Sequence, residues 1–266
     1  MQILSKTNKS ILSAMVRTDF KLRYQNSVLG YLWSLLRPLL LSLILYEVFV
    51  NFLKISGDIR HYASYLLLGI MCWTFFIEVT TGAVGAVVGK GDLIRKIAIP
   101  RYLTVVSTSA SALINFSLNF VVLGAIMIIS GVEIHVSFLY FVPLLLIELY
   151  VISLSVAFIL SAAFVKFRDL SFIWEVFTQL FFYLTPIIYP VSRILEKYHH
   201  WGRLVLLNPL AQIIQDLRYI LVTPQTQTIW QQFGGYAFIP LAFIAILSVC
   251  SIRYFRNESK TFAENV

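Results

Sequence analysis

Charged residues are scarce in this chain of 266 residues. They make up 13% of the sequence, whereas a soluble domain carries about 25%. The hydrophobic share is 59%, and the mean hydropathy is +0.80. A chain of this length with so little charge is expected to fold in lipid. The net charge of +8 therefore does not indicate nucleic-acid binding, because no basic soluble domain exists to carry it.

Cysteine and histidine are also few. Cys72 and Cys250 both lie in apolar runs, without the spacing of a metal site or a disulfide framework, so they are predicted to be small buried residues. The histidines fall in predicted outer loops and offer no metal site: His61, His135, His199 and His200. The charged first 30 residues contain no uninterrupted apolar run of the kind found in a cleavable signal peptide.

A complete phosphate-binding loop is missing. Between Gly85 and Gly89 there are three residues instead of four, and Lys90 is followed by glycine instead of Ser or Thr. Nothing in this segment would hold Mg²⁺, so the chain is not expected to hydrolyse ATP alone. The glycines at 82, 85 and 89 are instead expected to allow close packing of helices in lipid.

Long apolar runs are what the sequence does have. Each is about the 20 residues needed to cross about 30 Å of hydrocarbon as a helix. The predicted fold is an all-α integral membrane protein with six spans: residues 31–53, 62–88, 103–131, 138–165, 170–189 and 233–252. It forms one domain, with an interface helix at 1–30, a six-span bundle at 31–256 and a tail at 257–266.

Two further segments are expected to be helical without crossing. In residues 1–30, Leu12, Met15, Val16 and Phe20 share one face of a basic amphipathic helix, which suits the headgroup layer. Between the fifth and sixth spans, Asn208 can cap a helix that begins with Pro209. That helix is too short and polar to cross, and it would lie on the outer surface or dip in and return.

The distribution of Lys and Arg predicts the orientation. Fifteen lie on one side of the predicted spans, namely Lys6, Lys9, Arg17, Lys21, Arg23, Arg37, Lys90, Arg95, Lys96, Arg101, Lys166, Arg168, Arg253, Arg256 and Lys260. Six lie on the other side, namely Lys54, Arg60, Arg193, Lys197, Arg203 and Arg218. The positive-inside rule then places both termini in the cytosol.

The loop between the second and third spans is predicted to form one small helix. Asp92 can cap it, Leu93, Ile94 and Ile97 share a face, and Pro100 ends it. Basic side chains surround this apolar face. The segment therefore resembles a handle that a membrane protein offers to a cytosolic partner.

Acidic and aromatic residues within the spans leave alternatives open. Glutamates lie in apolar runs, where an ionisable group is either functional or interfacial: Glu47, Glu78, Glu148 and Glu175. The fifth span is rich in aromatic rings, either as an interfacial belt or as a lining for the apolar faces of sugars. Pro186 and Pro190 would loosen its end, as a gate requires.

Five motifs in this order resemble the membrane subunit of polysaccharide-exporting ABC transporters, the ABC-2 family of the Wzm/TagG type. They are residues 19–38, residues 92–101, Phe-Arg-Asp-Leu at 167–170, Leu-Thr-Pro-Ile-Ile-Tyr-Pro at 184–190 and Leu-Asn-Pro-Leu at 207–210. The likeness covers nearly the whole chain. It implies a homodimer with two copies of a separate ATP-binding cassette subunit, which would bind the ATP and Mg²⁺, so this chain has no cofactor. It also implies a bacterial inner-membrane location and an undecaprenyl-diphosphate-linked glycan, such as O-antigen or teichoic acid, as the substrate.

The resemblance also implies roles for particular residues. Coupling to the ATPase is expected from Asp92, Leu93, Ile94, Arg95, Lys96, Ile97, Arg17, Asp19, Lys21, Arg23, Arg168 and Asp169. The channel is expected to involve Tyr31, Trp33, Arg37, Phe177, Phe181, Phe182 and Tyr183. The outer gate, with re-entrant helices, is expected to involve Thr185, Pro186, Tyr189, Pro190, Asn208 and Pro209.

Two other functions compete with glycan export. One is export of a drug or lipid by the same superfamily, which a greasy lateral cleft would favour. The other is a multi-spanning membrane transferase, which would need a His/Asp or paired-carboxylate site at membrane depth. The sequence offers no such pattern.

Overall fold

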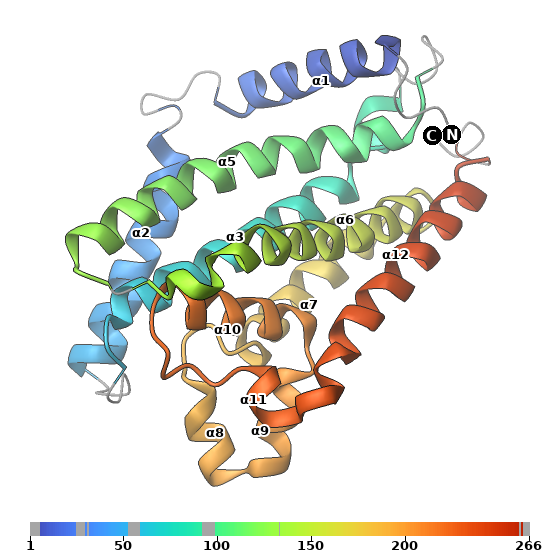
Figure 1. Ribbon diagram of the computed structural model, residues 1–266. Coiled ribbons are helices and arrows are strands. Elements are labelled where there is room, and N and C mark those ends of the chain that lie inside the picture. The colour runs from blue at the N-terminus through green and yellow to red at the C-terminus, as the bar shows by residue number, and fades with distance from the viewer. Residues whose placement is uncertain are drawn as a thin grey trace.

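The computed structural model describes residues 6–24, 30, 32–52, 59–91, 99–132, 134–260 and 262. Helices make up the regular structure of these residues (Figure 1). In chain order they are α1 (Lys6–Tyr24), α2 (Leu32–Tyr46), the π-helical η1 (Glu47–Phe52), α3 (Tyr62–Val84), the short η2 (Val88–Lys90), α5 (Tyr102–Ile129), η3 (Val136–Phe141), α6 (Val142–Lys166), α7 (Leu170–Leu184), α8 (Val191–Lys197), α9 (His199–Leu206), α10 (Pro209–Leu221), α11 (Ile229–Phe233), η4 (Gly234–Phe238) and α12 (Ile239–Glu258).

Five helical segments of the described chain are long and apolar enough to cross a membrane. They are Leu32–Phe52, Tyr62–Val84, Tyr102–Ile129, Val136–Lys166 and Ile229–Glu258. Four of the predicted spans are matched closely. The last predicted span, 233–252, lies within the segment Ile229–Glu258, in which α11 and η4 come before α12 and α12 continues to Glu258. The predicted tail at 257–266 therefore starts inside a helix.

The predicted span at 170–189 is wrong in length. Its helix, α7, has 15 residues, which is about 22 Å and short of the hydrocarbon thickness. Pro186 explains the early end, because the residue before a proline is forced out of helical geometry. Thr185 is accordingly extended, with φ −90° and ψ 132°.

Helix α3 is the centre of the molecule. It is apolar on all sides, and most of its side chains are buried, as expected of a helix surrounded by protein. Helices α2, α5, α6, α7 and α10 all pack against it. In Figure 1 it crosses the middle of the bundle, with α5 and α6 alongside.

Helix α10 is also enclosed. It packs against α3, α6, α9, α11 and α12, and almost all of its side chains are buried, polar ones included. The sequence predicts an apolar stripe with polar residues facing elsewhere, so burial of the polar faces is unexpected. With α8, α9 and α11, this helix lies toward the end of the molecule away from the start of α1 and the end of α12 (Figure 1).

Large apolar side chains cover much of the outside of the bundle. Helix α7 exposes Phe172, Ile173, Val176, Leu180 and Leu184, which share one face. Similar faces lie on α2, α5 and α12. Apolar surface of this extent indicates contact with lipid or with another protein.

The amphipathic helix predicted in residues 1–30 is present as α1, but part of its apolar face is covered by protein. Met15 is buried against Ile99 and Leu103, with Ile11 and Leu12 at the edge of this cluster. The face predicted for the headgroup layer therefore contacts the start of α5.

The glycines predicted to allow close packing are not tightly packed. A Cβ atom at Gly85 or Gly89 would meet nothing within 4 Å, and one at Gly82 would make only an ordinary contact with Thr108. Of the described glycines of α3, Gly69 is the one whose added Cβ atom would clash, because it would meet the side chain of Arg218 on α10. The cysteine prediction also holds only in part, because Cys72 is buried and Cys250 is exposed.

Candidate functional site

The residues predicted to contact an ATPase lie partly in a network at one end of the bundle. The ammonium of Lys90 lies 2.7 Å from Asp19 Oδ2, and it donates to Ser107 Oγ at 3.1 Å. The Ser107 hydroxyl in turn donates to the same Asp19 oxygen at 3.0 Å. Three segments, α1, η2 and α5, are tied together by these contacts, immediately before the loop that follows Gly91.

The rest of the predicted coupling set lies around this network or outside the described residues. Arg17 and Lys21 are exposed on α1, and Arg168 and Asp169 are exposed in the turn between α6 and α7. The guanidinium of Arg168 lies over the ring of Phe164, at 5.5 Å. The segment from Asp92 to Ile97, including Leu93, Ile94, Arg95 and Lys96, and the side chain of Arg23 lie outside the described part of the chain.

Contacts between distant segments bring the predicted cytosolic regions to the same end. Lys166 pairs with Glu258 at 2.6 Å, which joins the ends of α6 and α12. The guanidinium of Arg101, before α5, lies over the ring of Phe262, which is buried against Phe255 of α12. The start of α1 and the end of α12 also lie at this end (Figure 1). Basic residues that are far apart in the sequence therefore share one side of the bundle, as predicted.

Aromatic rings form a continuous row along α7. Trp174 stacks on Phe177, with ring centroids 5.6 Å apart, and Phe177 stacks on Phe181 at 5.4 Å. Helix α3 extends the row, because Trp73 lies against both Phe181 and Phe182. We call these five rings (Trp73, Trp174, Phe177, Phe181 and Phe182) the aromatic row.

The predicted channel residues are only partly brought together. Phe177, Phe181 and Phe182 belong to the aromatic row, and Tyr183 is exposed beyond it. Trp33 and Arg37 are exposed on α2, which lies on the other side of α3 from α7 (Figure 1). Tyr31 lies outside the described residues.

The predicted outer-gate residues do form one cluster. The side chain of Asn208 caps α10 by accepting from the Leu210 N–H at 3.0 Å. Its amide Nδ2 donates to Thr185 Oγ1 at 3.2 Å. Two motifs that are 23 residues apart are thereby joined. The turn they hold contains Pro186, Tyr189 and Pro190, and the Tyr189 hydroxyl donates to the Tyr183 carbonyl at 2.8 Å.

Arg218 is the main residue of this region that the sequence analysis missed. It is fully buried, and it donates to three backbone carbonyls: Tyr65 at 3.0 Å, Pro186 at 2.7 Å and Ile187 at 2.6 Å. Its guanidinium also lies 3.5 Å from the centre of the Tyr65 ring. Burial lowers the pKa of Arg218, and its neighbour Tyr65 acts in the opposite direction.

Gly69 makes room for this arginine. A Cβ atom at that position would lie 2.4 Å from Arg218 Nη2. The sequence analysis counted Arg218 only as one of the cations outside the spans. Its place directly after Leu217 and three residues after Gln215, on a helix rich in apolar residues, was the available signal that this helix buries polar groups.

Taken together, the apolar helices and the grouping of basic residues at one end define a multi-pass helical membrane protein. The chain belongs to the ABC-2 type transporter family, whose pattern matches residues 11–222. This confirms the predicted resemblance to the membrane subunits of ABC exporters.

Three similar proteins are described as permease proteins of O-antigen export systems. The chain is 27% identical, over 256 residues, to an O-antigen export system permease protein of Klebsiella pneumoniae; the match covers 96% of this chain and 94% of the relative. A second Klebsiella pneumoniae protein with that description matches to the same extent. A Myxococcus xanthus protein, also described as an O-antigen export system permease, is 27% identical over 212 residues, or 80% of each chain.

Proposed function

We propose that this chain is the membrane subunit of an ATP-driven exporter of a lipid-linked polysaccharide. The substrate would be an undecaprenyl-diphosphate-linked glycan, such as O-antigen or teichoic acid. One observation carries this proposal, namely the similarity to O-antigen export permeases over nearly the full length of both chains. The chain is a transport subunit in this proposal, and ATP and Mg²⁺ are bound by a separate ATPase.

The coupling step would begin at residues 92–97. In our proposal, closure of two ATPase subunits on ATP displaces this segment, which sits in a groove of the ATPase. Lys90 lies directly before the segment and contacts both Asp19 and Ser107. A displacement of the segment would therefore reach α1 and α5 together.

The path for the glycan would lie between two copies of the chain. The exposed apolar faces of α2 and α7 support this arrangement, because one copy alone leaves them uncovered. The α7 rings of the aromatic row, of which Phe177 is the most exposed, would offer flat surfaces along which a sugar polymer can slide without fixed hydrogen bonds. This feature favours a glycan over a drug, since it extends along α7 as a row and is not a single pocket.

The outer end would be closed by the cluster of Thr185 and Asn208. Helix α7 would enter the membrane and end within it, and α8 to α10 would return the chain as re-entrant helices. Burial of α10 on all sides supports this, because a segment that dips into the bilayer must have its polar groups enclosed by protein. The turn 185–190 would then be the part that moves when the path opens.

The test replaces residues 92–97 with a Gly-Ser linker in a strain whose own copy of the gene has been deleted. We expect the variant to insert in the inner membrane, to lose co-purification with the ATPase, and to leave the cell surface without glycan. A matched control replaces residues 224–227, a segment of the predicted outer loop, with a Gly-Ser linker as long as the segment that it replaces. Intact surface glycan with the first linker would contradict the proposal, and export of a drug or lipid with unchanged glycan would favour the competing function.

A further inference from the structure

A pair of buried carboxyl groups joins α6 to α10. Glu148 lies on α6 and Asp216 on α10, with 7% and 6% of their surfaces exposed. Between them is the amide of Gln212, itself 4% exposed, whose Nε2 donates to Asp216 Oδ2 at 2.8 Å. The same amide neighbours the Glu148 carboxyl, and the two carboxyl groups are close enough to interact electrostatically.

This group of three side chains is short of hydrogen-bond donors. Glu148 Oε1 and Gln212 Oε1 are buried and accept no hydrogen bond from the described residues. Ionised carboxylates are acceptors only, and the Gln212 amide supplies the two N–H groups of one nitrogen. A buried acceptor without a donor is costly, so an additional hydrogen-bond donor would stabilise this group.

The neighbouring cations are directed elsewhere. On α10 itself, Arg218 donates to the carbonyls of Tyr65, Pro186 and Ile187. Arg203 of α9 donates to the Gln232 carbonyl and lies over the Phe233 ring.

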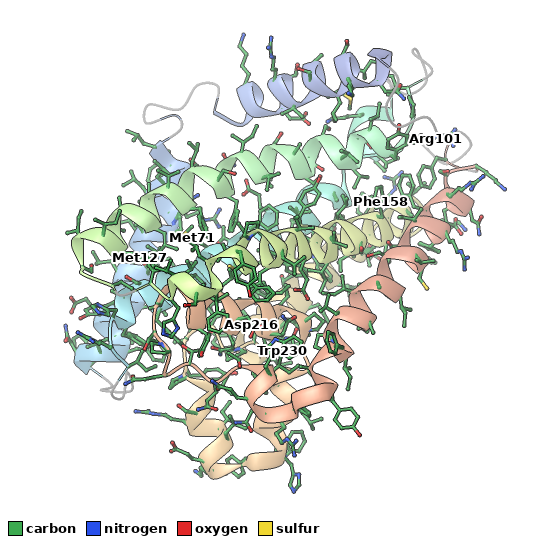
Figure 2. The ribbon with its side chains drawn as sticks, viewed as in Figure 1. Met71, Arg101, Met127, Phe158, Asp216 and Trp230 are labelled. Carbon is green, nitrogen blue, oxygen red and sulfur yellow. The ribbon has the colours of Figure 1, made fainter. Side chains whose placement is uncertain are left out.

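Titratable groups on the packed elements also contact other partners. On α3, Glu78 accepts from the Asn115 amide, and the Tyr62 hydroxyl donates to the Ile188 carbonyl. His135, before η3, lies against Tyr219, and Tyr150 of α6 shares a hydrogen bond with Ser109. On α12, the part near α10 has no charged residue between positions 239 and 252. The indole of Trp230, on α11, lies beside the Asp216 side chain (Figure 2). This indole carries no charge.

Ionising both Glu148 and Asp216 in this buried site would be costly. Burial disfavours the charged form of each, and each charge disfavours the other. Acid pairs of this kind hold one proton between them. A proton on Glu148 would donate to Gln212 Oε1, or to Asp216, and would thus give the unpaired acceptors the hydrogen they lack.

We propose that Glu148, Gln212 and Asp216 form a buried proton-binding site, in which the bound proton holds α10 against α6. The ligand is a proton and not a metal ion, because two carboxyl groups and one amide from two helices provide too few oxygen atoms to replace the water around a divalent cation. The inference does not depend on what the chain transports.

The pKa of Asp216 agrees with a proton-binding site at this place. Burial raises the pKa of Asp216 from 3.8 to about 6, and the side chains of Gln212 and Trp230 limit the rise. A carboxyl group whose pKa is raised by folding favours the folded state when protonated. Its contribution is fully present below pH 3.8 and is lost as the pH rises through about 6.

The first test is infrared spectroscopy of the full chain in lipid nanodiscs at pH 7. We expect a carbonyl band from a buried protonated carboxylic acid, which disappears in Glu148→Gln, in Asp216→Asn or in both. Glu175→Gln, a change at an exposed glutamate of α7, is the matched control and should leave the band unchanged. Absence of the band in the unaltered protein, or its persistence in both site variants, would overturn the proposal.

The second test is the melting temperature as a function of pH, which remains informative if one site variant does not fold. The unaltered protein should melt several degrees lower at pH 8 than at pH 5, and Glu148→Gln, which imitates the protonated acid, should reduce this difference. The Glu175→Gln control should retain it. An equal pH dependence in Glu148→Gln and the unaltered protein would contradict the proposal. Stabilisation by Na⁺ at pH 8 that Glu148→Gln abolishes would also overturn it, in favour of a metal cation.

Discussion

Arg218 shows how one charged residue can organise an apolar region. Its fork of N–H donors reaches the carbonyls of Pro186 and Ile187, in the non-helical turn after α7, and the carbonyl of Tyr65 in α3. A turn carbonyl left without a donor in the interior would cost free energy, and the guanidinium supplies that donor. The arginine therefore fixes the position of the turn that contains Pro186.

The first prediction concerns the glycine that accommodates this arginine. Gly69→Ala places a methyl group 2.4 Å from Arg218 Nη2, so the guanidinium must shift and lose hydrogen bonds. We expect the free energy of unfolding in detergent to fall by about 1–3 kcal/mol. Gly124→Ala, in α5, is the control, because its Cβ would meet nothing within 4 Å. Equal stability of the two variants would contradict the role given to Arg218.

At this scale the sequence was informative where residues form motifs and uninformative where they act alone. The resemblance to polysaccharide-exporting membrane subunits implied that Thr185 and Asn208 belong to one gate, and the structure places them in contact. Arg218 and Gly69 belong to no motif. Their relation depends on the packing of α10 against α3, which the periodicity of neither helix predicts.

Single elements differ from their predicted form where a proline or a neighbouring helix decides the outcome. Hydropathy alone extends the fifth span to residue 189, but Pro186 ends α7 at Leu184. The amphipathic pattern of α1 predicts an apolar face correctly. It cannot say whether lipid or protein covers that face, because both are apolar, and Met15 is buried against α5.

The second prediction tests the joint between α7 and α10. Thr185→Val and Asn208→Ala each remove one partner of the 3.2 Å hydrogen bond, and Asn208→Ala also removes the cap of α10, at a cost of about 0.5–2 kcal/mol. In a double-mutant cycle, the two changes should be coupled by about 0.5–1.5 kcal/mol. Unfolding free energies of the four proteins in one detergent measure this. Additive effects would show that the two motifs are merely neighbours.

The third prediction concerns the link between α1, η2 and α5, and it depends on the proposed function. Lys90→Met should lower export several-fold, with a loss of stability below about 1 kcal/mol, because partly exposed ion pairs contribute little to folding. The exchanged pair, Asp19→Lys with Lys90→Asp, should recover part of the export. Surface glycan, at matched amounts of protein in the membrane, is the measurement.

A matched control breaks a second ion pair at the same end. Lys166→Met removes the 2.6 Å contact with Glu258, which does not involve η2 or α1. Export by this variant should be close to normal. If Lys166→Met and Lys90→Met reduced export equally, a general effect of charge at this end would replace the proposed link.

At the scale of the whole molecule, the membrane fold and the grouping of basic segments on one side agree with the distribution of charge along the sequence. Composition predicted a membrane fold, and the basic segments were predicted to share one side, which the contacts of Lys166 with Glu258 and of Arg101 with Phe262 bear out. The sequence could not predict the enclosed position of α10. Whether a short polar helix lies on a surface or within a bundle depends on space left by other helices.

The fourth prediction tests the orientation. In a background that carries both Cys72→Ser and Cys250→Ser, the cysteine of His200→Cys in α9 should react with a membrane-impermeant thiol reagent added to the outside of spheroplasts. A single cysteine at Lys260, beyond α12, should react only after the membrane is opened. The reverse pattern would place the basic end outside and would contradict the coupling of this end to a cytosolic ATPase.

The central claim is that this chain moves its substrate only when a separate ATPase drives it from the basic end. The most direct test measures ATP-dependent passage of an undecaprenyl-diphosphate-linked glycan across the membrane of vesicles that contain the purified chain with or without its ATPase. The account predicts transport when the chain, the ATPase and ATP are all present, and none when any one is left out. Transport by the chain alone, at a rate independent of the ATPase and of ATP, would contradict it.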